Sequence, residues 1–240
     1  MYAAATQQDR KRIAAEALLI EADELGKQGG KTAPQAIEKL EQAVLVWREI
    51  GEPVWVAWSL NKVGRAHVSL NQNDKAIEYY EKALATNREL KNRYGEGAIL
   101  NNLGNAYFNL RQFAKAIEFF EKSLTLFREV KDRRWEGLTI YQLGNVRMNL
   151  NEPEKAIACF EQALPIMREV KDKAFEAQAL KLKEIQAQLD ADTLLLEYAF
   201  GEERSYLWAI SKDSLASYEL PKEELIDQIA REVYEMLTSA

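Results

Sequence analysis

The feature that most constrains this chain is a segment that recurs every forty residues. The sequence LNNLGNAYFNLRQFAKAIEFFEK at 100–122 has one close copy forty positions earlier and another forty positions later. The residues in register include Gly64, Gly104, Gly144, Ala76, Ala116, Ala156, Arg88, Arg128 and Arg168. Self-similarity at a fixed period of this length is typical of repeat architectures, in which each unit contacts only its neighbours.

Each copy has the pattern of two amphipathic helices joined by a short polar turn. Glycine inside a helix costs about 1 kcal/mol relative to alanine, so its recurrence predicts that another part of the repeat comes close at that point. The second helix carries an aromatic residue between small ones, at Tyr80, Phe120 and Phe160. Because one hairpin cannot bury its apolar side alone, we expect the hairpins to stack.

The residues of the central copy resemble the tetratricopeptide repeat (TPR) family. The matching positions are Leu103, Gly104, Tyr107, Ala116, Phe120 and Ser123. The repeat is longer here, because the usual TPR has about 34 residues. The resemblance covers residues 15–174 and implies an all-α fold, a right-handed superhelical solenoid of antiparallel helix hairpins. It also implies a protein-binding function.

The repeat pattern predicts one helical domain over residues 1–189. Its hairpins are expected at 10–50, 54–91, 94–131 and 134–171, and a capping helix at 174–189. The first hairpin is divergent, since its first helix lacks the glycine and its turn contains Gly29 and Gly30. Terminal repeats are commonly atypical because one of their faces meets solvent.

The pattern changes in residues 190–240, which we expect to form a second, incomplete unit. Three short segments, 193–200, 204–210 and 215–220, have the β-branched and aromatic content of strands. Pro221 is followed by two acidic residues, which is typical of a helix start. A β-β-β-α unit is incomplete on its own, because one helix covers only one face of a sheet.

The motifs LLEY, GEERSYLW and SYELP in this second unit resemble the opening strands of the CHAT domain, a caspase-like peptidase domain. The resemblance implies that the repeats recruit substrates or regulators to such a peptidase. The catalytic His and Cys of that family would lie beyond residue 240, so the chain would be a shortened form. Two functions stay open: a non-catalytic interaction module, or the N-terminal portion of a cysteine peptidase. Exposed edges of an unfinished sheet also favour self-association through these strands.

Composition argues against several other classes of function. The net charge is −6 and no stretch is strongly basic, so we expect no nucleic-acid partner. No apolar run approaches the ~18 residues needed to cross a membrane. The N-terminus lacks a basic start followed by an apolar segment, which favours a cytoplasmic protein without a signal peptide.

A catalytic or metal site is not expected from this sequence. His67 and Cys159 are the sole histidine and cysteine, and they fall two repeats apart. A nucleophile and its base must lie within hydrogen-bonding reach, so we interpret both as packing residues. We therefore expect no enzyme activity in this chain, no metal and no cofactor.

The candidate binding residues are polar side chains on the first helix of each hairpin. They are Asn61, Lys62, Arg65, Asn101, Asn102, Asn105, Asn109, Tyr141, Gln142, Asn145 and Asn149. In TPR arrays this side of the first helix lines the concave groove, so the resemblance implies contact with a peptide or protein ligand. Asparagine is a poor helix former, so its recurrence calls for a reason. The amides either bind the main chain of an extended peptide or bond neighbouring helices to one another.

Overall fold

The computed structural model describes residues 6–28 and 31–171 in full, and the backbone of three strands at 195–200, 205–210 and 215–220. The chain divides into two compact units, Met1–Val146 and Arg147–Ala240, and each is described by itself.

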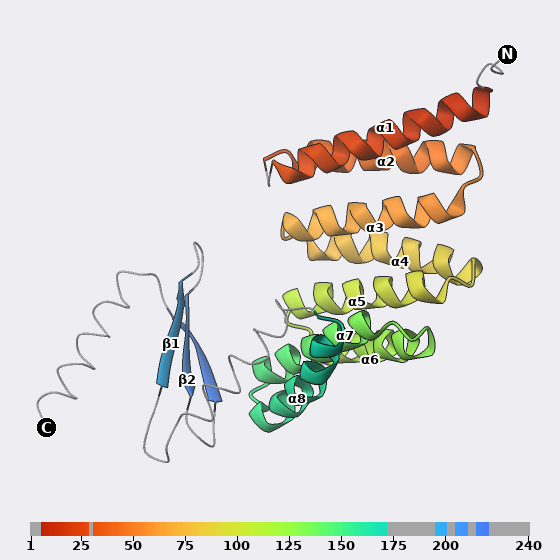
Figure 1. Cartoon of the computed structure of the whole chain (residues 1–240). Helices are drawn as coiled ribbons and strands as arrows, with labels where there is room; N and C mark the ends of the chain where they lie inside the picture. The colour runs from red at the N-terminus through yellow and green to blue at the C-terminus, as the bar shows by residue number, and fades with distance from the viewer. Residues whose placement is uncertain (1–5, 29–30, 172–194, 201–204, 211–214, 221–240) are drawn as a thin grey trace, which may run out of the picture. The chain divides into compact units, whose positions relative to one another are not determined.

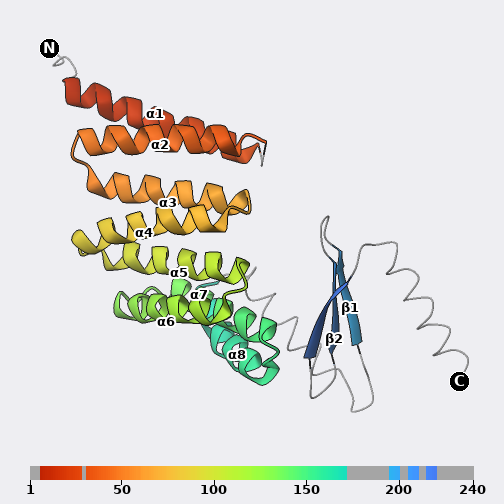
Figure 2. The ribbon, with the colours of Figure 1, turned by 180° about the vertical axis from the view of Figure 1, so that it is seen from behind.

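The described residues contain eight helices (Figures 1 and 2). They are α1 (Gln7–Lys27), α2 (Ala33–Glu49), α3 (Pro53–Ser69), α4 (Asn73–Glu89), α5 (Arg93–Asn109), α6 (Phe113–Glu129), α7 (Arg133–Asn149) and α8 (Pro153–Glu169). Each helix from α2 to α8 has 17 residues. The helices predicted for all four hairpins are confirmed, and the helical part has the architecture of a TPR-like solenoid.

The turns that follow α2 to α7 share one hydrogen-bonding pattern. After α4, the Lys91 N–H donates to the Arg88 carbonyl at 3.0 Å and the Asn92 N–H to the Asn87 carbonyl at 2.9 Å. This is the Schellman arrangement, with Lys91 in the left-handed region at φ 53°. The Asn92 side chain then accepts a hydrogen bond from the Gly95 N–H at 3.1 Å. Asn92 therefore helps to end α4 and to begin α5. Each connection between successive helices from α2 to α8 has three residues.

In the first unit the hairpins α1–α2, α3–α4 and α5–α6 stack in sequence order, as Figures 1 and 2 show. Glycines allow helices of one hairpin to approach closely. A Cβ atom added at Gly104 would lie 2.6 Å from the Phe120 ring, and one at Gly64 would lie 2.4 Å from the Tyr80 ring. The close approach predicted from the recurring glycine is confirmed at these two positions.

Aromatic stacking and buried ion pairs connect successive hairpins. Trp47 of α2 stacks on Trp55 of α3 with ring centroids 5.2 Å apart. At the joint between α4 and α5, the buried Glu96 carboxylate accepts from Arg88 Nε and from Arg93 Nη1, each at 2.9 Å. The α6–α7 joint has both kinds of contact, since Phe127 stacks on Trp135 and Glu136 forms an ion pair with Arg128.

The second unit contains α8 and a sheet of three antiparallel strands, β1 (Leu195–Phe200), β2 (Ser205–Ile210) and β3 (Leu215–Leu220). The strand order is β1-β2-β3, and the strands fall on the three predicted segments. The predicted capping helix at 174–189 and the helix after Pro221 lie outside the described residues. The β-β-β-α unit and the division of the chain at residue 189 therefore stay predictions.

Candidate functional site

The candidate polar residues of the first unit lie on α3, α5 and α7, the first helices of successive hairpins. Residues three and four positions apart are neighbours on a helix surface, which places the candidates of each helix along one side. Asn101 is buried, Arg65, Asn109 and Asn149 are exposed, and Asn61, Lys62, Asn102, Asn105, Tyr141, Gln142 and Asn145 are half-buried. Burial raises the pKa of the Tyr141 hydroxyl. Asn149 lies after Val146, where the first unit ends.

Side-chain amides bond α5 to the hairpin before it. Asn102 Nδ2 donates to Asn61 Oδ1 of α3 at 2.7 Å. Asn109 Nδ2 donates to Asn73 Oδ1 of α4 at 3.1 Å.

A longer run of amides joins α5 to α7. Asn101 Nδ2 donates to Thr139 Oγ1 at 3.1 Å, and Asn105 Nδ2 donates to Asn101 Oδ1 at 3.2 Å. Gln142 Nε2 donates to Asn105 Oδ1 at 3.0 Å, and Asn145 Nδ2 donates to Gln142 Oε1 at 3.1 Å. We call Asn61, Asn101, Asn102, Asn105, Gln142 and Asn145 the amide ladder. The ladder bonds neighbouring helices to one another, and its contact with a peptide stays a prediction.

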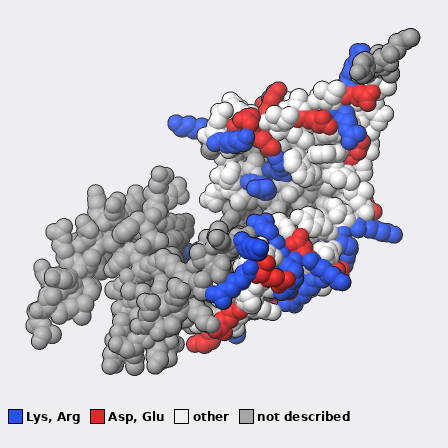
Figure 3. Space-filling model, viewed as in Figure 1, with Lys and Arg blue, Asp and Glu red and all other residues white. Residues whose placement is uncertain are grey.

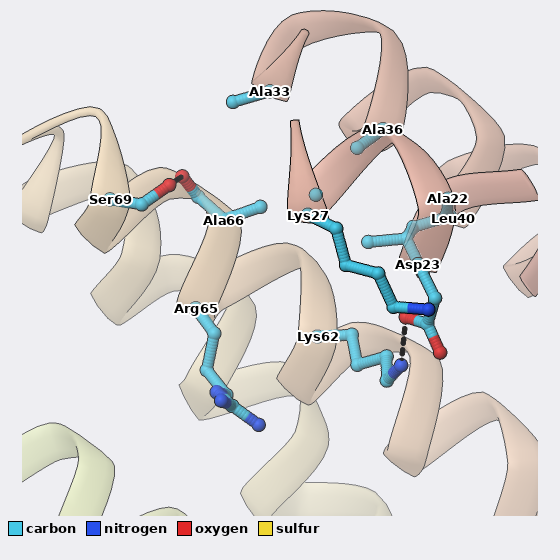
Figure 4. Close-up of a pocket in the computed structure, with 11 residues that line it drawn as sticks. Ala22, Asp23, Lys27, Ala33, Ala36, Leu40, Lys62, Arg65, Ala66 and Ser69 are labelled. Atoms are coloured by element: carbon cyan, nitrogen blue, oxygen red, sulfur yellow. Dashed lines mark hydrogen bonds and ion pairs between the residues drawn. The ribbon is translucent and has the colours of Figure 1, made fainter. Parts of the chain in front are cut away.

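A pocket of about 510 Å³ lies between α1, α2 and α3 (Figure 4). Small and apolar residues make up much of its lining: Ala22, Gly26, Ala33, Ala36, Leu40 and Ala66. The polar lining residues are Asp23 and Lys27 from α1 and Lys62, Arg65 and Ser69 from α3. Two of the predicted candidates, Lys62 and Arg65, therefore meet at this pocket.

The pocket carries an excess of positive charge. Its one acidic side chain, Asp23, forms an ion pair with Lys62. Lys27 pairs with Glu24 at 2.7 Å, and that hydrogen bond, with a smaller contribution from Asp23, raises the pKa of Lys27. Among the described residues, Arg65 has no acidic side chain within salt-bridge distance. Of the three basic residues that line the pocket, Lys62 and Lys27 each have an acidic partner, and Arg65 is the one for which the described residues provide none.

Two exposed apolar side chains precede the cations on α3. Val54 and Trp58 are 55% and 39% exposed. The Lys62 ammonium lies 4.2 Å from the centroid of the Trp58 ring. Trp58, Lys62 and Arg65 are spaced by four and three residues, so they share one side of the helix.

Asp23, Lys27 and Trp58 were not predicted as site residues. The sequence pattern of α1 indicates that Asp23 belongs to an acidic face exposed to solvent. The position of Trp58 near the start of a helix indicates packing between hairpins. The available signal was the spacing of Trp58 four residues before Lys62, which places an aromatic and a cation together on a helix surface.

The sole histidine and cysteine have ordinary structural surroundings. His67 is buried, its Nδ1 lies 2.8 Å from Gln72 Oε1, and its ring stacks on Tyr79. Cys159 is half-buried, and burial raises the pKa of its thiol, which disfavours the reactive thiolate. Whether the two residues lie apart stays a prediction.

Within the part of the chain that the structure describes, no group of three or more His, Cys, Asp and Glu side chains could hold a metal ion. No described helix is both long and apolar enough to cross a bilayer. On the face seen in Figure 3, basic and acidic side chains are interspersed.

Stacked helical hairpins, two of which place a glycine opposite an aromatic ring, define a helical repeat protein. The family model of the tetratricopeptide repeat matches residues 30–89 and 95–169, more than half of the 240 residues. The chain therefore belongs to the TPR family.

Solved structures with the same fold include an aspartyl phosphate phosphatase and two Rap proteins. Aspartyl phosphate phosphatase F from Bacillus subtilis is 15% identical with a TM-score of 0.65, and the match covers 73% of this chain and 44% of that one. Apo RapI is 18% identical with a TM-score of 0.66, and the match covers 75% of this chain and 64% of that one. The Rap conjugation gene regulator of plasmid pLS20, in complex with the Phr* peptide, is 16% identical with a TM-score of 0.62. The match covers 80% of this chain and 51% of that one.

This chain thus spans less than two thirds of the length of each of these three proteins, and at these identities the likeness shows the fold alone. No curated protein matches the chain.

Proposed function

We propose that this chain is a non-catalytic interaction module that binds an extended peptide or protein segment along the amide ladder. The observation that carries the proposal is the run of side-chain amides across α3, α5 and α7. An amide side chain has two N–H donors and an oxygen with two lone pairs. It can therefore bond the main chain of an extended segment, whose own N–H and C=O groups have no helix or sheet partner.

The candidate residues have different roles in this proposal. Asn102, Asn105, Gln142 and Asn145 are half-buried and contact the ligand main chain. Asn101 is 1% exposed and acts as a positioning residue, because its oxygen accepts from Asn105. Asn61 is the ladder residue of α3 and accepts a hydrogen bond from Asn102. The remaining candidates lie on the same three helices as the ladder: Lys62, Arg65, Asn109, Tyr141 and Asn149. Peptide binding by a Rap protein of the same fold supports the proposal by analogy.

The proposal is tested by ladder variants that keep the helices folded. Peptides are first captured by the full chain from a random library. The affinity of each peptide is then measured for the wild-type chain and for the variants Asn105→Ala and Gln142→Ala. We expect each variant to weaken binding about tenfold, the effect of losing ~1.4 kcal/mol. Gln42→Ala is a control, because Gln42 is an exposed amide that bonds Glu38 within α2. If the ladder variants lose thermal stability but keep full affinity, the ladder only holds the helices together.

We also propose that the module recruits partners to a caspase-like peptidase of the CHAT type. The support is the motifs LLEY, GEERSYLW and SYELP in residues 195–221, a region that follows the matched repeats. The test is whether a CHAT-type peptidase domain joined after residue 240 cleaves a substrate that the repeats capture, and whether Asn105→Ala slows that cleavage. Cleavage that is equally fast without the repeats would exclude a recruiting role.

Self-association is a separate proposal. The outer strands β1 and β3 of the described sheet could each pair with a second copy of the chain. Light scattering at increasing protein concentration tests this, and a constant monomer mass would contradict it.

A further inference from the structure

We infer that the segment bound by this chain carries a glutamate or aspartate side chain that enters the pocket between α1 and α3. We further infer that it carries an apolar side chain three residues away, which packs on Trp58. This inference rests on the proposed function and specifies two side chains of the segment that binds along the amide ladder.

The charge of the pocket selects an acidic group. Lys62 is already neutralised by Asp23, whereas Arg65 has no acidic partner among the described residues. A carboxylate placed beside Arg65 forms a charge-assisted hydrogen bond, and a guanidinium can hold both oxygens at once. A basic ligand group would instead add a fourth cation to the three that line the pocket.

The size of the pocket favours a side chain within a segment. Its volume of about 510 Å³ greatly exceeds what a carboxylate group alone occupies. The lining residues Ala22, Ala36 and Ala66 have short side chains, so the methylene groups of a glutamate would find apolar contacts on the way to Arg65. The remaining ligand chain would continue past Asn61, which bonds Asn102 of the ladder.

Trp58 sets the position of the apolar residue. It lies seven residues before Arg65 on α3, which at the helix rise corresponds to about 10 Å. An extended segment covers ~3.4 Å per residue, so three residues bridge the two points. Val54, one turn before Trp58, is also exposed and enlarges the apolar contact.

The test uses the full chain and a library of peptides with blocked ends. Each peptide has one central glutamate and random residues on both sides, and a parallel library has glutamine at the centre. We expect the glutamate library to be enriched at least tenfold, with Leu, Phe or Trp selected three residues from the glutamate. Arg65→Gln should abolish the preference for glutamate over glutamine. Trp58→Ala should abolish the apolar preference but keep the preference for glutamate.

Lys75→Gln is the matched control for charge, because Lys75 is an exposed cation of α4 that does not line the pocket. It should leave both preferences unchanged. Peptides that bind without preference for glutamate would overturn this inference and leave the proposed function standing. A higher affinity for a phosphoserine or a free C-terminal carboxylate than for the glutamate side chain would also overturn it. If no peptide of either library binds, both proposals fail.

Discussion

At the scale of single residues, Ser59 and Thr139 occupy equivalent positions two repeats apart, and both are fully buried. Thr139 Oγ1 donates to the Trp135 carbonyl at 2.8 Å and accepts from Asn101 at 3.1 Å. Ser59 Oγ has no hydrogen-bond partner among the described residues. A buried hydroxyl without a partner destabilises the fold, whereas a paired one contributes about 1 kcal/mol.

Removing the two hydroxyls should therefore have different effects. We expect Ser59→Ala to leave the free energy of unfolding unchanged or raise it by up to ~1 kcal/mol, because an unpaired polar group is lost. Thr139→Val keeps the side-chain shape and should lower it by about 1–2 kcal/mol. Denaturant unfolding measures both. Equal losses in the two variants would mean that Ser59 has a partner, such as a bound water.

Left-handed residues in the turns offer a second test at this scale. Lys91 has φ 53° at a position where the turn after α2 has Gly51 at φ 73°. The left-handed conformation costs about 1–2 kcal/mol for a residue with a Cβ. Glycine avoids this cost, but part of the benefit is lost because glycine gives up more conformational freedom on folding. Lys91→Gly should raise the free energy of unfolding by ~0.5–1 kcal/mol, and Gly51→Ala should lower it. Thermal unfolding checks both, and a lower melting temperature for Lys91→Gly would contradict this account of the turn.

At the scale of elements, the pairing of α5 with α6 depends on Gly104. An alanine there would bring its Cβ within 2.6 Å of the Phe120 ring. Overpacking of this kind costs about 1–3 kcal/mol, so Gly104→Ala should lower the free energy of unfolding by that amount. Adding Phe120→Leu should restore part of the loss, because it removes the ring that the new methyl group meets.

Gly26→Ala is the matched control for this prediction. A Cβ at Gly26 meets nothing within 4 Å, and the residue lies near the end of α1. The higher helix propensity of alanine should then raise stability by up to ~1 kcal/mol. A similar loss in both variants would show that the loss at Gly104 does not come from the contact with the Phe120 ring.

The helices were predictable from the sequence because each hairpin repeats the same local signals. Gly64 and Gly104 mark where an aromatic of the second helix packs, and the polar turns recur at the helix ends. The capping box at the start of α1, between Thr6 and Asp9, was missed because 1–8 has no repeat counterpart.

The pocket was harder to predict from the sequence than the ladder. The ladder residues recur at helical spacing within the repeats, which made their shared face visible. The Asp23–Lys62 pair joins residues 39 positions apart, and α1 diverges from the repeat that would have aligned them. Whether Asn101 and Asn105 bond a ligand or each other was not decided by spacing, because both arrangements place them on the same side of α5.

At the scale of the whole molecule, the ladder couples hairpins that are separate in sequence. The bond from Asn102 to Asn61 spans 41 residues. A double-mutant cycle with Asn61→Ala and Asn102→Ala should give a coupling energy of about 0.5–1.5 kcal/mol, the usual contribution of one hydrogen bond. The exposed Gln42–Glu38 pair within α2 is the control, and its coupling should be smaller. Zero coupling between Asn61 and Asn102 would mean that the ladder does not hold α3 to α5.

The most direct test of ligand binding along the ladder is amide hydrogen exchange of the full chain, with and without a peptide captured from the library. We expect the bound peptide to slow exchange in α3 around 58–69, in α5 around 101–109 and in α7 up to Val146, while α4 and α6 exchange as before. Protection confined to α4 and α6, or absent from all five helices while the peptide is bound, would show that the ligand binds elsewhere and would contradict the account.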